Sequence, residues 1–362
     1  MADRRADRLA ALRRSLEAAK LDGILLTSLP NIRYLTGFTG SSALVAVTQS
    51  ELLLVTDFRY DTQVREEVGD LARVDIEGQS LWDGLWRILG EIRSVEIMGF
   101  ESAYLVHRDF ERLLNAGSRW QWHATVSMVE ALREQKDAGE VALIEQAVGV
   151  ASRALEMAVQ SVRVGMTELA IAGALEQALR DEGSEGFPFE TIVASGPRAA
   201  LPHARPGARR LERGDFLLID FGAIVGGYCS DVTRTFVAGR ANAEQREIFE
   251  VVRGANEVAA SGVHAWMSGR DADALARHYI EDRGYGEGFG HSLGHGIGLE
   301  VHEAPRLAKT AEAALPAHAV VTIEPGIYRA GWGGVRIEDD VVLDPDGPRV
   351  LTGLPRELLE IG

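Results

Sequence analysis

The chain has 362 residues, 46% of them hydrophobic, and this length favours two packed domains over a single core. Asp and Glu outnumber Lys and Arg by 54 to 38, which gives a formal net charge of −16. Nucleic acids and anionic membrane surfaces attract basic proteins, so we expect neither as a partner. The single cysteine excludes an internal disulfide, and no apolar run approaches the roughly 18 residues of a membrane span. The charged N-terminus is unlike a signal peptide, so we expect a cytoplasmic protein.

The first part of the chain alternates between helical and extended patterns. Apolar residues at helical spacing predict helices at 3–19, 61–68, 80–92 and 107–116. Short apolar runs bounded by Gly, Ser, Thr or Asp predict strands at 24–26, 43–47, 52–55 and 95–100. Strands that alternate with helices indicate an α/β domain with a mixed sheet.

The second part combines long helices with hairpins. Helical composition extends over 126–163 with a break at 136–140, and we place a domain boundary there, giving domains 1–134 and 135–362. Further helices are predicted at 167–182, which Thr167 would cap, and at 244–263 and 271–283. Strands are predicted at 191–194, 216–222, 228–237, 319–324 and 335–343, with a hairpin turn at Gly226-Gly227. This mixture predicts an α+β domain.

Two aspartates flank the predicted hairpin. Asp220 ends the apolar run 216–219, and Asp231 follows eleven residues later, beyond the turn. A carboxylate at the end of so apolar a strand needs a polar partner or a metal ion. Either aspartate alone is more typical of a turn cap. Because the hairpin brings the two together, we expect them to meet near its open end.

Three histidines and three glycines lie between His291 and Glu303. Glycines let a backbone approach a ligand closely, and we interpret this segment as a strand that carries the metal ligand His295. His302 follows seven residues later and is expected to face the same cavity without touching the metal. A single histidine is more often a satisfied core residue, but three within so short a segment favour function.

Two further carboxylates follow on extended segments. Glu324 precedes Pro325, whose missing N–H ends a strand ladder, so we place Glu324 at a strand end. Arg336 and Glu338 are two residues apart and are predicted on one face of one strand. A buried arginine beside a carboxylate is suited to stabilise an anion, whereas an exposed Arg–Glu pair is the ordinary alternative.

Asp220, Asp231, His295, Glu324 and Glu338 together supply four carboxylates and one imidazole. Hard oxygen ligands with one nitrogen suit Mn²⁺, Co²⁺, Zn²⁺ or Fe²⁺ better than a cysteine-rich structural zinc site. Two divalent ions about 3.5–4 Å apart need several carboxylates, some of them bridging, to offset their repulsion. The sequence therefore predicts a two-metal centre.

Two nearby residues are less specific. His203 lies in a Gly/Pro/Arg-rich loop, where one histidine is as readily solvated as functional. Cys229 has no His/Asn pattern around it, and we interpret it as a small apolar filler rather than a nucleophile.

The motifs resemble those of the pita-bread metallopeptidases, which include methionine aminopeptidase, prolidase and aminopeptidase P. The matching segments are IDFGAIVGGYCSDVTRTF, HSLGHGIGLEVHE, TIEPGIY and VRIEDD, in the family's order, preceded by the loop ASGPRAALPHA. Arg198 departs from the smaller or amide residue expected in that loop. NIRYLTGFTGSSALVAVT resembles the first domain of the Xaa-Pro enzymes and creatinase. The resemblance implies an α/β creatinase-like N-terminal domain followed by an α+β pita-bread domain.

The resemblance also implies residue roles. Asp220 would bind one metal, Asp231 and Glu338 would bridge both ions, and His295 and Glu324 would complete the other ion's shell. Two divalent ions per chain are implied, with Mn²⁺ preferred and Co²⁺ or Zn²⁺ as alternatives. His203, His291 and His302 match substrate-binding histidines. His203, His302, Glu324 and Arg336 are the expected catalytic residues, with Glu324 as the proton shuttle.

The implied activity is removal of the N-terminal residue from peptides with proline in second position, as in aminopeptidase P. The segment NIRYLTGFTG favours this reading, and Xaa-Pro dipeptidase (prolidase) is the alternative. A prolidase must bind a free carboxylate, for which Arg198, Arg205, Arg209 and Arg210 are candidates unless they are merely solvated. A non-catalytic pita-bread binding protein is a remote alternative, because no metal ligand is missing. We expect a homodimer.

Overall fold

The computed structural model describes residues 3–362 and divides into two compact units. The first unit ends at Arg133, and the second runs from Glu134 to Gly362. The sequence analysis placed the boundary after residue 134. Within residues 3–362, no helix is long and apolar enough to cross a membrane.

A six-stranded mixed sheet organises the first unit, in the order β4-β3-β2-β1-β5-β6. β1 pairs antiparallel with β2, as does β2 with β3, and the other neighbours are parallel. The strands are β1 (Gly23–Leu26), β2 (Ala43–Thr48), β3 (Leu52–Asp57), β4 (Arg73–Glu77), β5 (Ile97–Glu101) and β6 (Gln121–Thr125). The helices are α1 (Arg5–Ala18), α2 (Leu29–Thr36), α3 (Asp61–Val68), α4 (Leu81–Gly90), α5 (His107–Asn115) and α6 (Glu130–Arg133), with 3₁₀ turns η1 (Phe58–Tyr60) and η2 (Gly69–Leu71).

Three of these α-helices and strands were missed by the sequence analysis. α2 has a proline in its first turn and ends at Gly37, whose positive φ of 79° terminates the helix after only eight residues. β4 and β6 are the two edges of the sheet, and their polar residues other than Thr125 are partly or fully exposed. Edge strands lack the apolar pattern of central strands, because one side of them meets water.

The second unit contains two large sheets, two two-stranded sheets (β9–β10 and β15–β16) and four long helices. One large sheet has the order β19-β11-β8-β7, and the other has the order β13-β12-β14-β17-β18. The helices are α7 (Ala138–Ser161), α8 (Glu168–Asp181), α9 (Ala243–Gly262) and α10 (Gly269–Glu281), with 3₁₀ turns η3 (Gly196–Ala200) and η4 (Gly286–Gly288). The strands are β7 (Ile192–Ser195), β8 (Phe216–Phe221), β9 (Ile224–Val225), β10 (Tyr228–Cys229), β11 (Val232–Ala238), β12 (Gly294–Gly296), β13 (Glu303–Leu307), β14 (Val320–Ile323), β15 (Gly326–Arg329), β16 (Gly333–Arg336), β17 (Asp339–Asp344), β18 (Gly347–Val350) and β19 (Glu360–Ile361).

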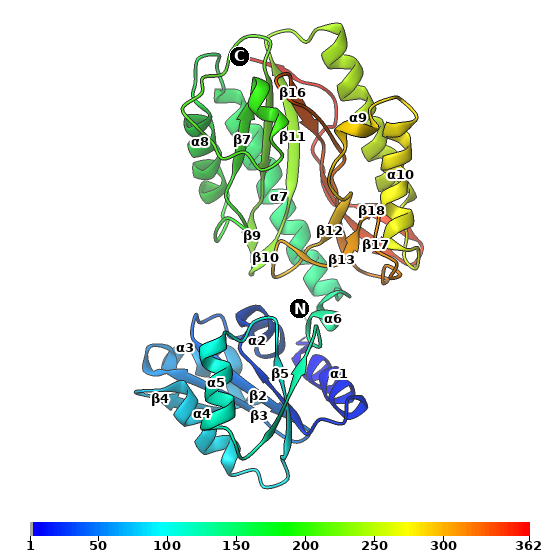
Figure 1. The fold of residues 1–362 in the computed structure, drawn as a ribbon. Coiled ribbons are helices and arrows are strands. Elements are labelled where there is room, and N and C mark those ends of the chain that lie inside the picture. The colour runs from blue at the N-terminus through cyan, green and yellow to red at the C-terminus, as the bar shows by residue number, and fades with distance from the viewer. Residues whose placement is uncertain (1–2) are drawn as a thin grey trace. The chain divides into compact units, whose positions relative to one another are not determined.

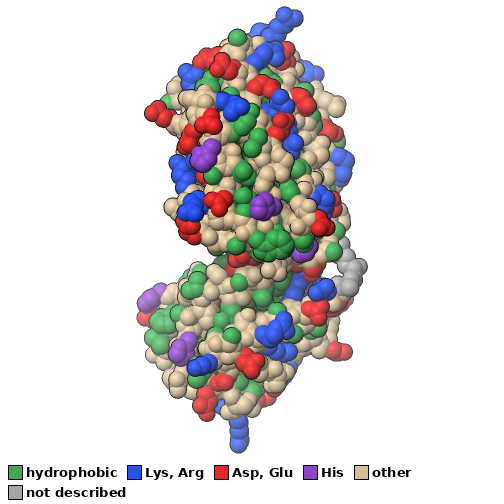
Figure 2. Space-filling model, turned by 90° about the vertical axis from the view of Figure 1, so that its right-hand side faces the viewer, with side chains coloured by type: hydrophobic (Ala, Val, Ile, Leu, Met, Phe, Trp, Pro, Cys, Tyr) green, Lys and Arg blue, Asp and Glu red, His purple; other side chains and the backbone are tan. Residues whose placement is uncertain are grey.

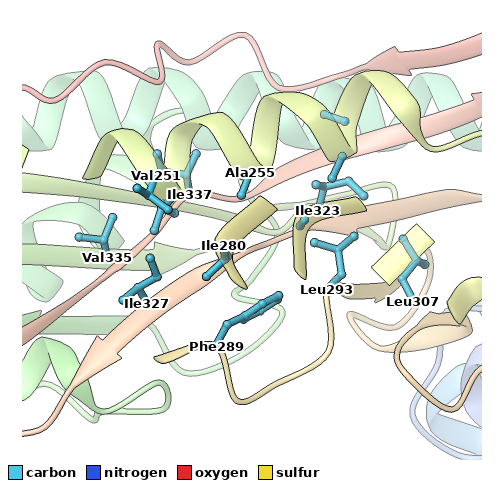
Figure 3. Packing of buried hydrophobic residues seen from close by; sticks show 14 of the residues in the cluster. Val251, Ala255, Ile280, Phe289, Leu293, Leu307, Ile323, Ile327, Val335 and Ile337 are labelled. Carbon is cyan, nitrogen blue, oxygen red and sulfur yellow. The ribbon is translucent and has the colours of Figure 1, made fainter. Parts of the chain in front are cut away.

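The helices of the second unit cover the two sheets from opposite sides, with α7 and α8 on one side and α9 and α10 on the other (Figure 1). α7 begins at Ala138, inside the predicted break, because Asp137 and Glu140 form a capping box. One apolar core joins α7 and α8 to β7, β8 and β11. A second core joins α9 and α10 to the other sheet, and in it Val251 and Ala255 lie over Ile323 and Ile337 (Figure 3).

The predicted hairpin turn is present. Gly226 and Gly227 connect β9 to β10 with φ values of 56° and 78°, the left-handed geometry that a two-residue turn requires. On one face of the molecule, acidic and basic side chains are interspersed and no basic patch gathers (Figure 2).

Candidate metal centre

Both sheets of the second unit contribute to one cluster of acidic residues. Asp220 lies in β8, and Asp231 directly precedes β11. His295 lies in β12, Glu324 directly follows β14, and Glu338 lies between β16 and β17. Asp220, Asp231 and Glu338 are buried, and His295 and Glu324 are partly buried. The structure therefore brings together the five residues that the sequence analysis selected as metal ligands.

Strand alternation explains why the ligands face one another. In β8, Leu217, Ile219 and Phe221 pack into the core beneath α7 and α8. Asp220 therefore lies on the opposite face, because successive side chains alternate across a strand. β11 follows the same rule, since Val232 and Phe236 join that core while Thr233 bonds to Glu338 on the other side.

Two local predictions were wrong. Asp220 is paired with Thr233, so the aspartates lie at the end of the β8–β11 hairpin that is nearer the turn, not at its open end. Arg336 and Glu338 do not share one strand, because β16 ends at Arg336 and β17 begins at Asp339. Their side chains still point to the same side, because Val335 and Ile337 both enter the core beneath α9.

His295 turns one ring nitrogen toward the carboxylates. Its Nε2 is 3.8 Å from Asp231 Oδ2 and 3.5 Å from Glu324 Oε1. Its Nδ1 is 3.0 Å from the carbonyl oxygen of Gly296. Since a carbonyl only accepts hydrogen bonds, Nδ1 carries the proton, and Nε2 keeps its lone pair. Burial lowers the pKa of His295 to about 4, so the ring is neutral near pH 7 and suited to bind a metal.

The carboxylates repel one another. Burial raises the pKa of Asp231 and of Glu338 well above the ordinary range, and neighbouring carboxylates raise both further. Burial also raises the pKa of Glu324, to about 8. One ligand atom each from Asp231, His295 and Glu338 lies within 4.8 Å of the other two. Such a cluster needs protons or a cation to offset its charge.

Two oxygens in this cluster lack a hydrogen-bond partner. Oδ1 of Asp220 and Oδ1 of Asp231 are buried and receive no hydrogen bond from the described residues. A buried acceptor without a partner costs roughly 1–3 kcal/mol, so such oxygens are rarely left unused. Carboxylate oxygens and one imidazole nitrogen are suitable ligands for Mn²⁺, Co²⁺ or Zn²⁺. The residues therefore fit a divalent metal site.

Arg336 connects two of the ligands. Its Nη2 donates to Oδ2 of Asp220, and its Nε donates to Thr233 Oγ1 at 3.0 Å. Thr233 in turn donates to Glu338 Oε2 at 2.6 Å. Nη1 donates to the Tyr328 hydroxyl at 2.8 Å and to the carbonyl of Pro202 at 3.3 Å. Arg336 is buried and mostly occupied by these bonds, so it orients Asp220 and Glu338.

Tyr328 was given no role from the sequence. Its hydroxyl accepts from Arg336 and lies 3.0 Å from His291 Nε2. His291 Nδ1 faces the carbonyl of Ser292 at 2.8 Å, so its proton is on Nδ1 and Tyr328 donates to Nε2. A Cβ at Gly334 would lie 2.7 Å from the Tyr328 ring. Gly334, which pairs with Tyr328 across β15 and β16, was the feature of the sequence that could have pointed to this tyrosine.

The other two histidines are exposed. The ring centroid of His302 lies 4.4 Å from that of His295, and desolvation by the protein on one side of the ring lowers the pKa of His302. His203 lies in the loop that follows η3, directly after Pro202, whose carbonyl accepts from Arg336. Both side chains are therefore accessible from solvent.

Replacing these histidines should separate metal binding from turnover. His295→Ala should lower metal affinity, because its Nε2 faces two carboxylates. His302→Ala should reduce turnover about 10- to 100-fold while leaving metal content nearly intact. His264→Ala, an exposed histidine held by the carbonyl of Ala265, should change neither quantity. Elemental analysis and turnover of the three variants test this division, and equal metal loss from His302→Ala and His295→Ala would refute it.

Comparison with known proteins identifies the family. Residues 142–345 match metallopeptidase family M24, and residues 8–135 match the creatinase/prolidase N-terminal domain. The chain belongs to metallopeptidase family M24. Both the predicted family and the predicted fold, a creatinase-like domain followed by a pita-bread domain, are confirmed.

Several relatives resemble the chain over nearly its whole length. An Xaa-Pro dipeptidase from Pyrococcus horikoshii is 35% identical, covering 95% of this chain and 96% of its own. The structure of an Xaa-Pro dipeptidase from Bacillus anthracis has a TM-score of 0.95 at 37% identity, covering 99% of this chain and 100% of its own. The structure of an X-Pro aminopeptidase from Thermotoga maritima has a TM-score of 0.90, also at 37% identity, covering 98% of this chain and 99% of its own.

Proposed function

We propose that this M24 peptidase is a dinuclear metal-dependent enzyme that removes the N-terminal residue from peptides with proline in second position. The observation that carries the proposal is the cluster of Asp220, Asp231, Glu324 and Glu338, three of them buried, with His295 Nε2 turned toward it. Relatives with both Xaa-Pro activities in their names support the proline preference. The remote alternative, a non-catalytic binding protein, would need a damaged ligand set, and all five ligands are retained.

Asp220, Asp231, His295, Glu324 and Glu338 would hold two divalent ions, for which we propose Mn²⁺ first, with Co²⁺ or Zn²⁺ as alternatives. When bound, the ions would supply an activated water and polarise the scissile carbonyl. Glu324 would hold the proton that the proline nitrogen must gain as it leaves, since that nitrogen carries no hydrogen in the peptide. Because Glu324 is partly exposed, its carboxylate could reach both the water and the proline nitrogen.

The histidines and Arg336 complete the proposed site. His203, His291 and His302 would contact the substrate, while Arg336 holds Asp220 directly and Glu338 through Thr233. Arg336 would thereby keep the ligand positions fixed as charge develops. The arginines of the preceding loop bear on the choice between the two Xaa-Pro activities.

Each of these loop arginines has a partner. Arg198 pairs with Glu168 at 3.0 Å, and Arg205 pairs with Glu190 at 3.0 Å. Arg209 pairs with Asp215 at 2.5 Å, and Arg210 donates to the carbonyl of Gly165 at 2.7 Å. Three of the four guanidiniums thus already face a carboxylate, with only the Arg205–Glu190 pair strongly exposed, and this supports a substrate that continues beyond proline. The dipeptidase alternative is favoured instead by the names of the relatives from Pyrococcus horikoshii and Bacillus anthracis.

Peptide length and the second residue test the proposal together. With Mn²⁺, Co²⁺ or Zn²⁺ added in turn, the protein should cleave Xaa-Pro-Xaa at the bond before proline and Xaa-Pro more slowly. Replacing proline by alanine should reduce kcat/KM by about 100-fold or more, because a pocket shaped for the ring places a chain nitrogen poorly. Cleavage of dipeptides alone would make the enzyme a prolidase. Release of N-terminal methionine regardless of the next residue would reject the Xaa-Pro assignment.

A further inference from the structure

The loop that carries His203 is held by an ion pair between the buried Glu168 and the partly exposed Arg198. We define the His203 loop as residues 196–207. We propose that Glu168 and Arg198 are positioning residues that fix this loop against the metal centre and thereby set the preference for proline. The inference rests on the proposed function, because it assumes that His203 contacts the substrate.

Glu168 is a hydrogen-bond acceptor for both ends of the His203 loop. Its side chain is fully buried. Its Oε1 accepts from the backbone N–H and the hydroxyl of Ser195, each at 2.8 Å. Its Oε2 accepts from the backbone N–H of Gly207 at 3.0 Å. Ser195 directly precedes the loop and Gly207 ends it, so one carboxylate closes the loop at its base.

These bonds are not needed for the helix that contains Glu168. α8 is capped by Thr167, whose Oγ1 accepts from the N–H of Ala170 at 3.1 Å. The Glu168 carboxylate therefore bonds to the loop rather than to its own helix. Its negative charge in the first helical turn is also favourable.

Arg198 braces the loop from within. Its Nε donates to Glu168 Oε2 at 3.0 Å, and its Nη2 donates to the carbonyl of Arg205 at 2.5 Å. One planar guanidinium thus ties the η3 turn to the chain beyond His203. Residues 199–204 lie between these two attachment points. Their path depends on Arg198, the residue at which the sequence departs from the expected family pattern.

The braced loop also contacts the metal centre. The carbonyl of Pro202, next to His203, accepts from Arg336 Nη1, and Arg336 holds the ligand Asp220. The backbone of η3 lies directly on β16, where a Cβ at Gly334 would come within 2.2 Å of the carbonyl oxygen of Ala199. A shift of the loop would therefore move His203 and loosen one bond to Arg336, without removing any metal ligand.

A double-mutant cycle tests the proposal. Arg198→Ala should raise KM for Xaa-Pro-Xaa about tenfold, with kcat changed less than about threefold and metal content unchanged. The ratio of kcat/KM for proline to that for alanine peptides should fall by a similar factor. In a His203→Ala background, Arg198→Ala should add almost nothing, because both changes remove the same positioned group.

Two further variants act as controls. Arg198→Met keeps the aliphatic part of the side chain and replaces Arg198→Ala if that variant unfolds. Arg205→Ala is the matched control. The Arg205 side chain is 83% exposed, and only its backbone carbonyl serves the brace, so its loss should leave KM unchanged.

The outcomes separate the two claims. A wild-type protein that cleaves no Xaa-Pro bond would overturn the proposed function and this inference with it. Normal wild-type cleavage with additive effects of Arg198 and His203, or with an unchanged ratio of proline to alanine cleavage in Arg198→Ala and Arg198→Met, would overturn the positioning role alone.

Discussion

Replacing Glu338 by glutamine should abolish turnover and metal binding and, at the same time, make the metal-free protein more stable to heat. Glu338 is buried, and its pKa is raised by burial and by the charges of Glu324 and Asp220. A neutral amide of the same shape removes one of four mutually repelling carboxylates. It can still accept from Thr233, so no new unsatisfied group need appear. The same change removes an oxygen ligand proposed to bridge both ions.

We expect kcat to fall by at least about 1,000-fold, since a bridging ligand serves both ions and metal chemistry supplies most of the catalysis. Elemental analysis, turnover with added Mn²⁺ and thermal unfolding in chelator measure the three effects. Asp344→Asn is the matched control, because Asp344 ends β17, the strand that directly follows Glu338, and pairs with Arg349 and His318 away from the cluster. A Glu338→Gln protein that retains both metal and turnover would show that the ligand assignment is wrong.

Residue chemistry made the cluster predictable from sequence. Carboxylates placed at the ends of apolar strands, such as Asp220 and Glu324, contradict the local pattern unless something compensates them. The Gly226-Gly227 turn fixed the hairpin that brings Asp220 near Asp231, since both positions need positive φ. These signals lie within short segments of the sequence. Recognising them needs only the order of strands and turns along the chain.

The interactions that orient the ligands were not predictable in this way. Glu168 binds Gly207 across 39 positions, and Arg336 binds Asp220 across 116 positions. No periodicity in the sequence links residues so far apart. Only part of the expectation for Arg336 and Glu338 failed. They lie on one side but not on one strand, and the direct carboxylate partner of Arg336 is the distant Asp220. Edge strands β4 and β6 were missed because their exposure removes the apolar signal.

The metal-free protein should lose stability as the pH rises from 6.5 to 8. Burial raises the pKa of Glu324 to about 8, whereas glutamate in an unfolded chain titrates near 4.3. The folded metal-free protein therefore keeps a proton that the unfolded chain has released. The stability linked to that proton is fully present below about pH 4.3 and is lost as the pH rises through about 8.

Two partly buried histidines set the lowest pH at which the effect of the carboxylates on stability dominates. Burial lowers the pKa values of His291 and His295 to about 4, so the unfolded chain binds more protons at these two residues between pH 4 and 6.5. Their contribution makes stability rise with pH in that range and opposes the carboxylate effect. Above pH 6.5 the two histidines of the unfolded chain release their remaining protons, which adds an opposing rise of less than about 1 kcal/mol, so the carboxylates dominate.

Between pH 6.5 and 8, Glu324 alone should lower the free energy of unfolding by about 2 kcal/mol, and Asp231 and Glu338 should add to this loss. Saturating Mn²⁺ should remove the decline, because a bound cation holds the carboxylates in their ionised form at both pH values. Denaturant unfolding at pH 6.5 and 8, in chelator and in Mn²⁺, measures both parts, with Asp344→Asn again expected to behave as the wild type. A chelated protein that is as stable at pH 8 as at pH 6.5 would mean that burial and neighbouring charges do not raise the pKa values of these carboxylates in the folded protein. The case for a cation at this centre would then lose its electrostatic basis.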